Sequence, residues 1–230
     1  DGGHVREEQI QLVHRCHGVA FAEELIANIE AAGGEACFLA TDVMDKAVLE
    51  QNYADIMARY GRIDVLLNAA GGNMPRATVS PEQTIFDLDV DAVKFCTDLN
   101  LYGTILPTMV FARAMAEQKS GSIINFASGA GLFGNFGQCS YAAAKEGIRG
   151  LSRVAATEWA KDGINTNVIC PLAWTAQLEG FKNAYPEAFA ANVKMPPAGH
   201  FGDSELEIGR VCVQLAHPDF KYMNGETLTL

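Results

Sequence analysis

Ser128, Tyr141 and Lys145 are three side chains whose types and order could support proton transfer. Tyr141 and Lys145 stand four residues apart in a helical stretch, so they lie on one helix face, one turn apart. A nearby ammonium favours the phenolate, and we expect Lys145 to lower the pKa of Tyr141 towards working pH. The same spacing also fits a structural helix, with the tyrosine in the core and the lysine extending to solvent.

The elements around these residues would bring them together. Residues 122–127 form a short apolar run that predicts a buried strand ending just before Ser128. A glycine-rich loop follows, and its backbone can turn sharply and approach a ligand closely. Tyr141 then opens a helix predicted to run to Lys161. The serine hydroxyl could therefore face the same point as the phenol.

The whole chain alternates strands and helices. This alternation is typical of a parallel sheet covered on both faces, and we predict one α/β domain over residues 1–230, doubly wound, in three layers. Predicted strands cover residues 9–13, 36–39, 63–67, 122–127, 165–170 and 225–230. The principal predicted helices follow the first strand up to Gly33 and then cover residues 46–60, 92–118, 138–161 and 204–216. Gly103 and Pro107 should bend the longest of these helices.

Composition narrows the function classes. The 230 residues carry a formal net charge of −11, which argues against nucleic acid or an anionic membrane as the main partner. No run approaches the ~20 apolar residues that span a bilayer, and the polar N-terminus does not resemble a signal peptide. Six scattered cysteines without a Cys-x-x-Cys pair predict free thiols, no metal centre and a cytoplasmic location.

Ser128, Tyr141 and Lys145, with the glycine-rich loop between them, resemble the active-site segment of the short-chain dehydrogenase/reductases. Asn100 stands where that family has its active-site asparagine. The resemblance implies a Rossmann-type fold and an NAD(P)(H)-dependent oxidoreductase that interconverts a ketone and a secondary alcohol. Tyr141 would protonate the carbonyl oxygen, Ser128 would hydrogen-bond it, Lys145 would hold the nicotinamide ribose, and Asn100 would position a water. The loop over residues 134–138 is similar to that of 3-oxoacyl-carrier-protein reductases.

Cofactor contacts are expected where strands end, because ligands of such sheets bind at the carboxyl edge. In the family, Asp-Val contacts adenine, Asn-Asn-Ala-Gly touches the cofactor, and a threonine after a proline meets the carboxamide. The matching residues are Asp42, Val43, Asn68, Ala69, Ala70, Gly71, Tyr141, Lys145, Pro171 and Thr175. Leu172 replaces the family's glycine after Pro171, and this puts the local backbone shape in doubt because leucine resists positive φ.

Arg15 follows the first predicted strand, at the position where the family distinguishes its cofactors. A cation there could pair with the 2′-phosphate of NADP, whereas an acidic residue would suit the ribose hydroxyls of NAD. NADP(H) is therefore favoured over NAD(H). The alternative is that Arg15 is an ordinary surface arginine.

The family's opening strand and Thr-Gly-x-x-x-Gly-x-Gly loop, which hold the pyrophosphate, have no counterpart in this sequence. That strand would lie beside the strands ending at Arg15 and Asn68. Its loss would leave two neighbours with unpaired backbone groups. We therefore expect the chain to be incomplete at its N-terminus.

Two further segments could surround a substrate. Residues 72–91 form an irregular insert in which Asn73 and Arg76 could line a pocket, or which could be a solvent loop. Residues 173–200 are predicted to form a helical lid over a small carbonyl or alcohol substrate, or to bury their aromatics in the core. The family resemblance also implies a homo-oligomer, a dimer or tetramer. A catalytically silent subunit or scaffold is the alternative function.

Overall fold

The computed structural model describes residues 9–12, 18–80 and 82–230, and Arg15 therefore lies outside the described residues. Its strands form two parallel sheets. The smaller sheet pairs β1 (Gln9–Leu12) with β2 (Glu35–Phe38). The larger sheet has the order β3-β4-β5-β6. Its strands are β3 (Val65–Asn68), β4 (Gly121–Phe126), β5 (Ile164–Cys170) and β6 (Thr227–Thr229).

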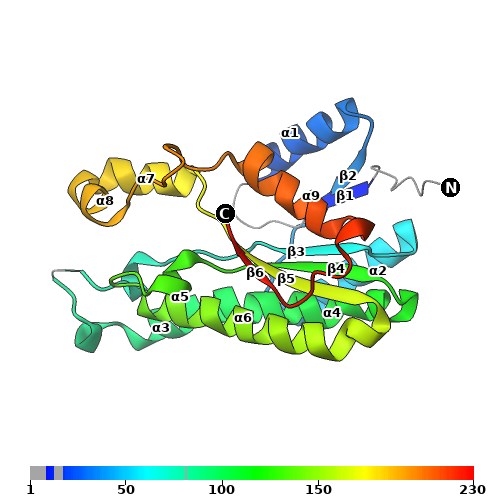
Figure 1. Ribbon diagram of the computed structural model, residues 1–230, viewed down its shortest axis with the longest axis horizontal. Helices are drawn as coiled ribbons and strands as arrows, with labels where there is room; N and C mark the ends of the chain where they lie inside the picture. The colour runs from blue at the N-terminus through cyan, green and yellow to red at the C-terminus, as the bar shows by residue number, and fades with distance from the viewer. Residues whose placement is uncertain (1–8, 13–17, 81) are drawn as a thin grey trace.

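Helices cover both faces of the larger sheet. In Figure 1, α2, α4 and α6 lie below the strands and α9 lies above them, which gives three layers. The α-helices are α1 (Gly18–Ala31), α2 (Lys46–Tyr60), α3 (Val90–Thr97), α4 (Gly103–Gln118), α5 (Gly129–Phe133), α6 (Cys139–Trp159), α7 (Ala176–Ala184), α8 (Pro186–Asn192) and α9 (Arg210–Ala216). The predicted Rossmann-type α/β class is confirmed. None of the described helices is long and apolar enough to cross a membrane.

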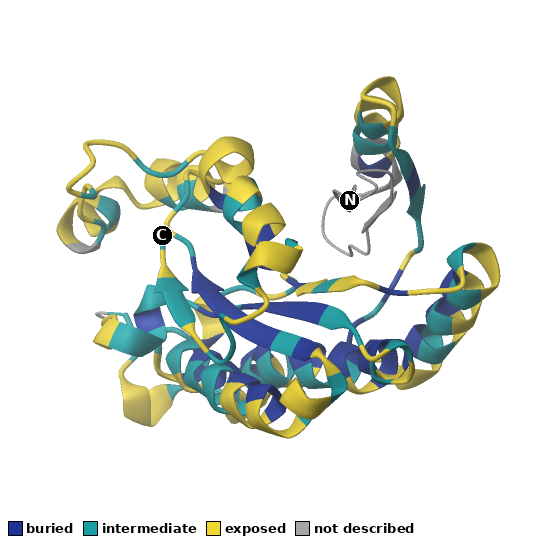
Figure 2. Ribbon diagram, turned by 45° about the vertical axis from the view of Figure 1, so that its right-hand side comes forward, coloured by how far each residue is buried: buried dark blue, intermediate teal, exposed yellow. Residues whose placement is uncertain are grey.

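Strand β4 lies at the centre of the core because consecutive side chains of a strand point to opposite faces. Ile123 packs against the α4 side, in a cluster with Val110 and Met115. Ile124 faces α9 and packs with Ile208 and Leu215. Figure 2 shows the buried residues concentrated along β4 and β5. An apolar run buried on both faces is what the sequence predicted for a central parallel strand.

The strands do not form the single sheet that the alternating pattern predicted. Among the described residues, β3 pairs with β4 on one side and has no strand on the other. Val65 and Leu67 in β3 are 37% and 47% exposed. Figure 2 shows α1 and β2 standing away from the larger sheet. The two sheets separate between β1 and β3, the two neighbours between which the family's opening strand was expected.

The long helix predicted over residues 92–118 is divided. A π-helical turn, η3 (Asp98–Tyr102), separates α3 from α4, and Asn100 lies inside it. Pro107 is accommodated within α4. The wider π turn therefore interrupts the regular α-helix directly before Gly103, and π turns occur frequently at functional sites.

The glycine-rich loop contains α5, a short helix that the sequence did not predict. The predicted lid is split into α7 and α8 at Tyr185 and Pro186. Short turns complete the fold: 3₁₀ turns η1 (Pro75–Ala77), η2 (Ile85–Asp87), η4 (Ala160–Asp162) and η6 (Pro218–Phe220), and the π turn η5 (Ser204–Gly209).

Candidate active site

Ser128, Tyr141 and Lys145 meet at the carboxyl edge of β4. Ser128 begins α5, where its hydroxyl accepts a hydrogen bond of 3.1 Å from the amide of Ala130. Tyr141 lies in the first turn of α6, near enough for the Ser128 side chain to act on the pKa of its hydroxyl. Lys145 Nζ donates to the Phe126 carbonyl at 2.8 Å and lies 5.5 Å from the centre of the Tyr141 ring. The three predicted residues therefore share one site.

Burial governs the ionisation of this site. It raises the pKa of Tyr141, while the hydrogen bond from Ser128 acts in the opposite direction. Burial also lowers the pKa of Lys145 to about 8. The expected lowering of the Tyr141 pKa by Lys145 is therefore wrong in this site. Lys145 approaches the face of the ring and bonds to the Phe126 carbonyl, so its charge does not offset the desolvation of the hydroxyl.

Asn100 uses its side chain to hold a backbone loop. Its Oδ1 accepts a hydrogen bond from the Gly72 amide at 3.0 Å, and its Nδ2 donates to the Gly72 carbonyl at 2.9 Å. Nδ2 also donates to the carbonyl of Cys96 at 2.8 Å, inside the same helical segment. Asn100 is fully buried. Its carboxamide therefore joins the π turn to the loop after β3.

Gly71 leaves a cradle beside Lys145. Its φ of 138° is in the region that favours glycine. A Cβ at this position would lie 2.5 Å from Asn100 Oδ1 and 3.6 Å from Lys145 Nζ. The absence of a side chain therefore lets the Asn100 carboxamide pack directly against Gly71, next to an ammonium that has used one of its three hydrogens on Phe126. The two remaining N–H groups of Lys145 suit the vicinal hydroxyls of a nucleotide ribose, and the Gly71 backbone lets a dinucleotide come close.

Asn68 is buried and forms part of a polar network between sheet and helices. Its Nδ2 donates to Thr108 Oγ1 at 2.9 Å and to Asn125 Oδ1 at 2.8 Å. Asn125 Nδ2 in turn donates to Ser152 Oγ at 2.9 Å. The network joins β3 and β4 to α4 and α6. Sequence reasoning singled out Asn68 and missed the other three members of the network, although a polar residue within the apolar run of β4 was a signal for Asn125.

The other expected cofactor residues have varied surroundings. Asp42 accepts a hydrogen bond from the Met44 amide at 3.1 Å. Val43 is buried, and its Cγ2 lies 2.9 Å from where a Cβ on Gly103 would be. Its side chain therefore packs on the start of α4, and its contact with an adenine ring stays a prediction. Ala69 is exposed and Ala70 half-buried beyond the end of β3.

The segment after β5 keeps an ordinary backbone despite Leu172. Lys119 is the one non-glycine residue with positive φ in the part of the chain that the structure describes. The Leu172 amide donates to the Leu230 carbonyl at 3.1 Å. Pro171, which precedes Leu172, is half-buried. Thr175 caps the start of α7, where its hydroxyl oxygen accepts a hydrogen bond of 3.2 Å from the Leu178 amide. The threonine hydroxyl hydrogen is not used in that bond.

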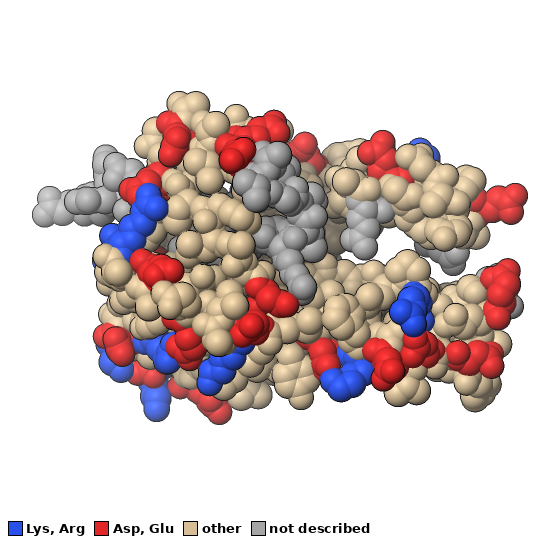
Figure 3. Space-filling model, turned by 180° about the vertical axis from the view of Figure 1, so that it is seen from behind, with Lys and Arg blue, Asp and Glu red and all other residues tan. Residues whose placement is uncertain are grey.

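The lid carries a chain of aromatic rings. Trp174 lies 5.5 Å from Phe201 and 6.3 Å from Phe189 between ring centres, and Phe189 lies 6.1 Å from Phe181. Trp174 is 37% exposed, so this cluster is not buried in the core. Figure 3 shows a hollow between the lobe that carries the lid and the body of the molecule. These aromatics are therefore not core residues, and closure of the segment over a substrate stays a prediction.

The insert over residues 72–91 holds its polar side chains within itself. Asn73 Nδ2 donates to Thr78 Oγ1 at 3.0 Å, and Arg76 forms an ion pair of 2.5 Å with Asp89. Neither is directed to the site around Tyr141 by these contacts. Within the described residues, no cluster of three His, Cys, Asp or Glu side chains could hold a metal ion.

The family model described as short chain dehydrogenase matches residues 5–185. A 12alpha-hydroxysteroid dehydrogenase of Clostridium sp. is 57% identical over 178 residues, which are 76% of this chain and 65% of that enzyme. The match thus spans less than two thirds of that relative's length. A 3-oxoacyl-[acyl-carrier-protein] reductase of Synechocystis sp. is 30% identical over 209 residues, 91% of this chain and 80% of the reductase.

Among solved structures, one is a provisionally named D-mannonate oxidoreductase from Haemophilus influenza with bound NAD. It superposes with a TM-score of 0.83 at 26% identity, over 95% of this chain and 83% of the other. This structural likeness agrees with the Rossmann-type fold described above.

Proposed function

Because the chain belongs to the short-chain dehydrogenase family, we propose that it is an NAD(P)(H)-dependent oxidoreductase that interconverts a secondary alcohol and a ketone. Tyr141 is the general acid and base of this reaction. Ser128 holds the reacting oxygen, and Lys145 binds the cofactor. Asn100 is a positioning residue that fixes the loop at Gly72.

The observation that carries the proposal is the meeting of Ser128, Tyr141 and Lys145 at one strand end. The serine side chain acts on the pKa of the phenol, so the two groups are near enough to each other to reach one substrate oxygen. A phenol whose pKa is raised by burial stays protonated at neutral pH, which suits a donor to a carbonyl oxygen. In the alcohol-oxidising direction, Tyr141 accepts the proton from the hydroxyl.

Gly71, Lys145 and Thr175 have the chemistry to hold a nicotinamide cofactor, which supplies or accepts the hydride when bound. Lys145 Nζ keeps two hydrogens for ribose hydroxyls, and the Gly71 cradle accepts close backbone approach. The Thr175 hydroxyl hydrogen can meet a carboxamide. Arg15 supports a preference for NADP(H), because a guanidinium can pair with a 2′-phosphate.

For the substrate, we favour a rigid, apolar hydroxysteroid. A relative 57% identical to this chain is named as a 12alpha-hydroxysteroid dehydrogenase. The exposed face of Trp174 at the carboxyl edge of the sheet, together with exposed Phe133 and Phe136 beyond Ser128, offers apolar surface for such a molecule. A 3-oxoacyl substrate is the second candidate, on the strength of the more distant reductase.

The deciding experiment measures turnover of 12α-hydroxysteroids and of a 3-oxoacyl thioester, each with NAD(H) and NADP(H). Steroid turnover that is lost in Tyr141→Phe supports the proposal. Nicotinamide binding, followed by fluorescence, is measured in parallel. Absence of both binding and turnover would favour the silent-subunit alternative.

We also propose that the protein self-associates through α4 and α6, which lie side by side in Figure 1. Large apolar side chains are exposed on this side of the molecule, on η3, α4 and α6: Tyr102, Met109 and Val154. An apolar patch of this kind is typical of an interface. Sedimentation of the Met109→Glu variant, which places a charge in the patch, tests this: the wild type should be a dimer or tetramer and the variant should dissociate.

A further inference from the structure

Residues 198–202, which follow the lid helices and are called the return segment below, contact Trp174 and its neighbours. The Trp174 amide donates to the Gly202 carbonyl at 3.0 Å, and the Gly202 amide donates to the Leu172 carbonyl at 3.0 Å. These bonds form a short parallel bridge between Ala173 and Gly202. The Phe201 ring packs against the Trp174 ring, tilted by 48° with 5.5 Å between the ring centres. The position of Trp174 therefore depends on where the return segment is held.

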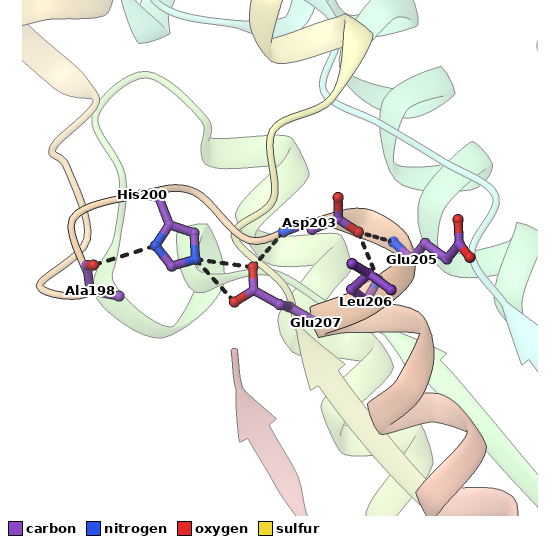
Figure 4. A network of polar contacts seen from close by, with 6 residues as sticks. All are labelled: Ala198, His200, Asp203, Glu205, Leu206 and Glu207. Atoms are coloured by element: carbon purple, nitrogen blue, oxygen red, sulfur yellow. Dashed lines mark hydrogen bonds and ion pairs between the residues drawn. The ribbon is translucent and has the colours of Figure 1, made fainter.

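His200 ties this return segment to the turn that precedes α9. Its Nε2 lies 3.0 and 3.1 Å from the two carboxylate oxygens of Glu207 in η5 (Figure 4). Glu207 also accepts a hydrogen bond of 2.7 Å from the Asp203 amide. Asp203 Oδ1 caps the same turn by accepting from the amides of Glu205 and Leu206 at 2.9 and 2.7 Å. The His200 imidazole is thus bound to a turn, η5, whose own start is held by the hydrogen bonds of Asp203.

Both ring nitrogens of His200 face acceptors. Nδ1 lies 3.3 Å from the Ala198 carbonyl oxygen, while Nε2 faces the carboxylate. A neutral imidazole has one N–H, so only the imidazolium can donate on both sides. Glu207 is the charged group in contact with the ring, Asp203 reaches Glu207 through its backbone amide, and the lid side contributes the neutral Ala198 carbonyl.

We propose that His200 and Glu207 are positioning residues for the substrate: the imidazolium–carboxylate pair holds the lid's return segment, and with it the ring of Trp174, at the mouth of the site. This rests on the proposed function in one respect, namely that Trp174 contacts an apolar substrate. The pair touches neither the reacting atoms nor Tyr141, so its effect falls on substrate affinity rather than on the chemical step.

The pair works within a pH window. Hydrogen bonding and charge attraction from Glu207 raise the pKa of His200 above 6.5, so the imidazolium–carboxylate pair is complete below 6.5. As pH rises through the raised value, the charge attraction and one of the two donated hydrogen bonds are lost. The hydrogen bond from the Asp203 amide, followed by that from His200, lowers the pKa of Glu207 below 4.5. Acid therefore breaks the pair only when the pH falls below the ordinary pKa of a glutamate and Glu207 becomes protonated.

The first test observes Trp174 directly and needs no catalysis. The chain has two tryptophans, Trp159 and Trp174, so a Trp159→Phe background makes Trp174 the sole reporter. Acrylamide quenching of Trp174 should increase in His200→Gln and Glu207→Gln, and in the parent as pH rises past the His200 pKa. The matched control is His217→Gln, because His217 forms a similar exposed pair, 3.4 Å from Asp219, on another turn.

The second test separates affinity from chemistry. Loss of an exposed pair should raise the KM for substrate by about two- to fivefold with little change in kcat. His200→Arg, a permanent cation, should restore quenching and KM and remove their pH dependence. Unchanged quenching in both Gln variants, or a pH profile that survives in His200→Arg, would overturn the proposal. Altered quenching without any turnover would leave the positioning role in place and count against the proposed reaction instead.

Discussion

The carboxamide of Asn100 forms two hydrogen bonds with Gly72, one to its amide and one to its carbonyl, across 28 positions of sequence. This paired contact connects the π turn of the long helix with the loop that follows β3. Gly71 and Lys145 lie directly beside it. The geometry of the expected cofactor cradle thus depends on a side chain in a different element.

Gly71→Ala should weaken nicotinamide binding. The new Cβ would press on Asn100 Oδ1 and require a φ of 138° from alanine. If the free variant relieves this strain by moving Asn100 and must restore it on binding, roughly 1.4 kcal/mol reduces affinity about tenfold. NAD(P)H fluorescence titration measures this. Gly61→Ala is the control, since it has a φ of 72° and no atom within 4 Å of the added Cβ. Equal affinities in the two variants would contradict the cradle.

Tyr141→Phe should lower kcat by about 10²–10⁴-fold, the usual contribution of a general acid or base. The ring and its packing against Cys96, Ala77 and Ala92 remain, so the thermal unfolding midpoint should barely change. Steady-state kinetics with calorimetry check both parts. Tyr222→Phe removes a hydroxyl from a fully exposed ring and should behave as wild type. Near-normal turnover in Tyr141→Phe would refute the assignment.

Lys145→Met should abolish turnover and at the same time stabilise the fold. Burial lowers the Lys145 pKa from 10.5 to about 8, so the unfolded chain binds more protons between these values. Wild-type stability should therefore rise from pH 8 to 10.5, and the penalty below pH 8 is up to about 3 kcal/mol.

Urea unfolding at pH 7 and at pH 10 measures this penalty. The Met variant should be more stable than wild type at pH 7, and its stability should lack the rise with pH. Lys161→Met, at an exposed site, serves as the comparison. A less stable Lys145→Met protein at pH 7 would show that the bond to Phe126 outweighs desolvation.

Asn68→Ala should destabilise the protein by about 2–4 kcal/mol, because it leaves buried acceptors on Thr108 and Asn125 without a donor. Denaturant unfolding monitors the change. Asn135→Ala, in an exposed loop, should cost little. A small effect at Asn68 would mean that the network relaxes around the gap.

Periodicity was enough to predict most elements of this fold. Apolar spacing located β4, α2 and α6 because each buries a regular face, and the position of Ser128 at a strand end placed it near Tyr141. The π turn at Asn100 could not be predicted, since one extra residue in a turn leaves the composition of the helix unchanged. Its cause is a contact with Gly72, which no local pattern contains.

Long-range pairs and desolvation were beyond the reach of the sequence. Asn68 and Asn125 are neighbours only because β3 and β4 pair in register, and His200 meets Glu207 only once the lid returns to the body. The sequence also did not indicate that the Tyr141 pKa is raised, because burial depends on the folded surroundings. Spacing indicated an ammonium nearby, whereas the surrounding burial determines the ionisation.

The open side of β3 has a practical consequence for anyone who handles this polypeptide. Among the residues that the structure describes, no strand pairs with this edge of β3, where Val65 and Leu67 are exposed, and such an edge is a template for pairing with another chain. Concentrated samples should therefore aggregate edge to edge, in assemblies unrelated to pairing through α4 and α6. A gatekeeper substitution, Leu67→Lys, should suppress this aggregation and leave the helix-mediated oligomer intact.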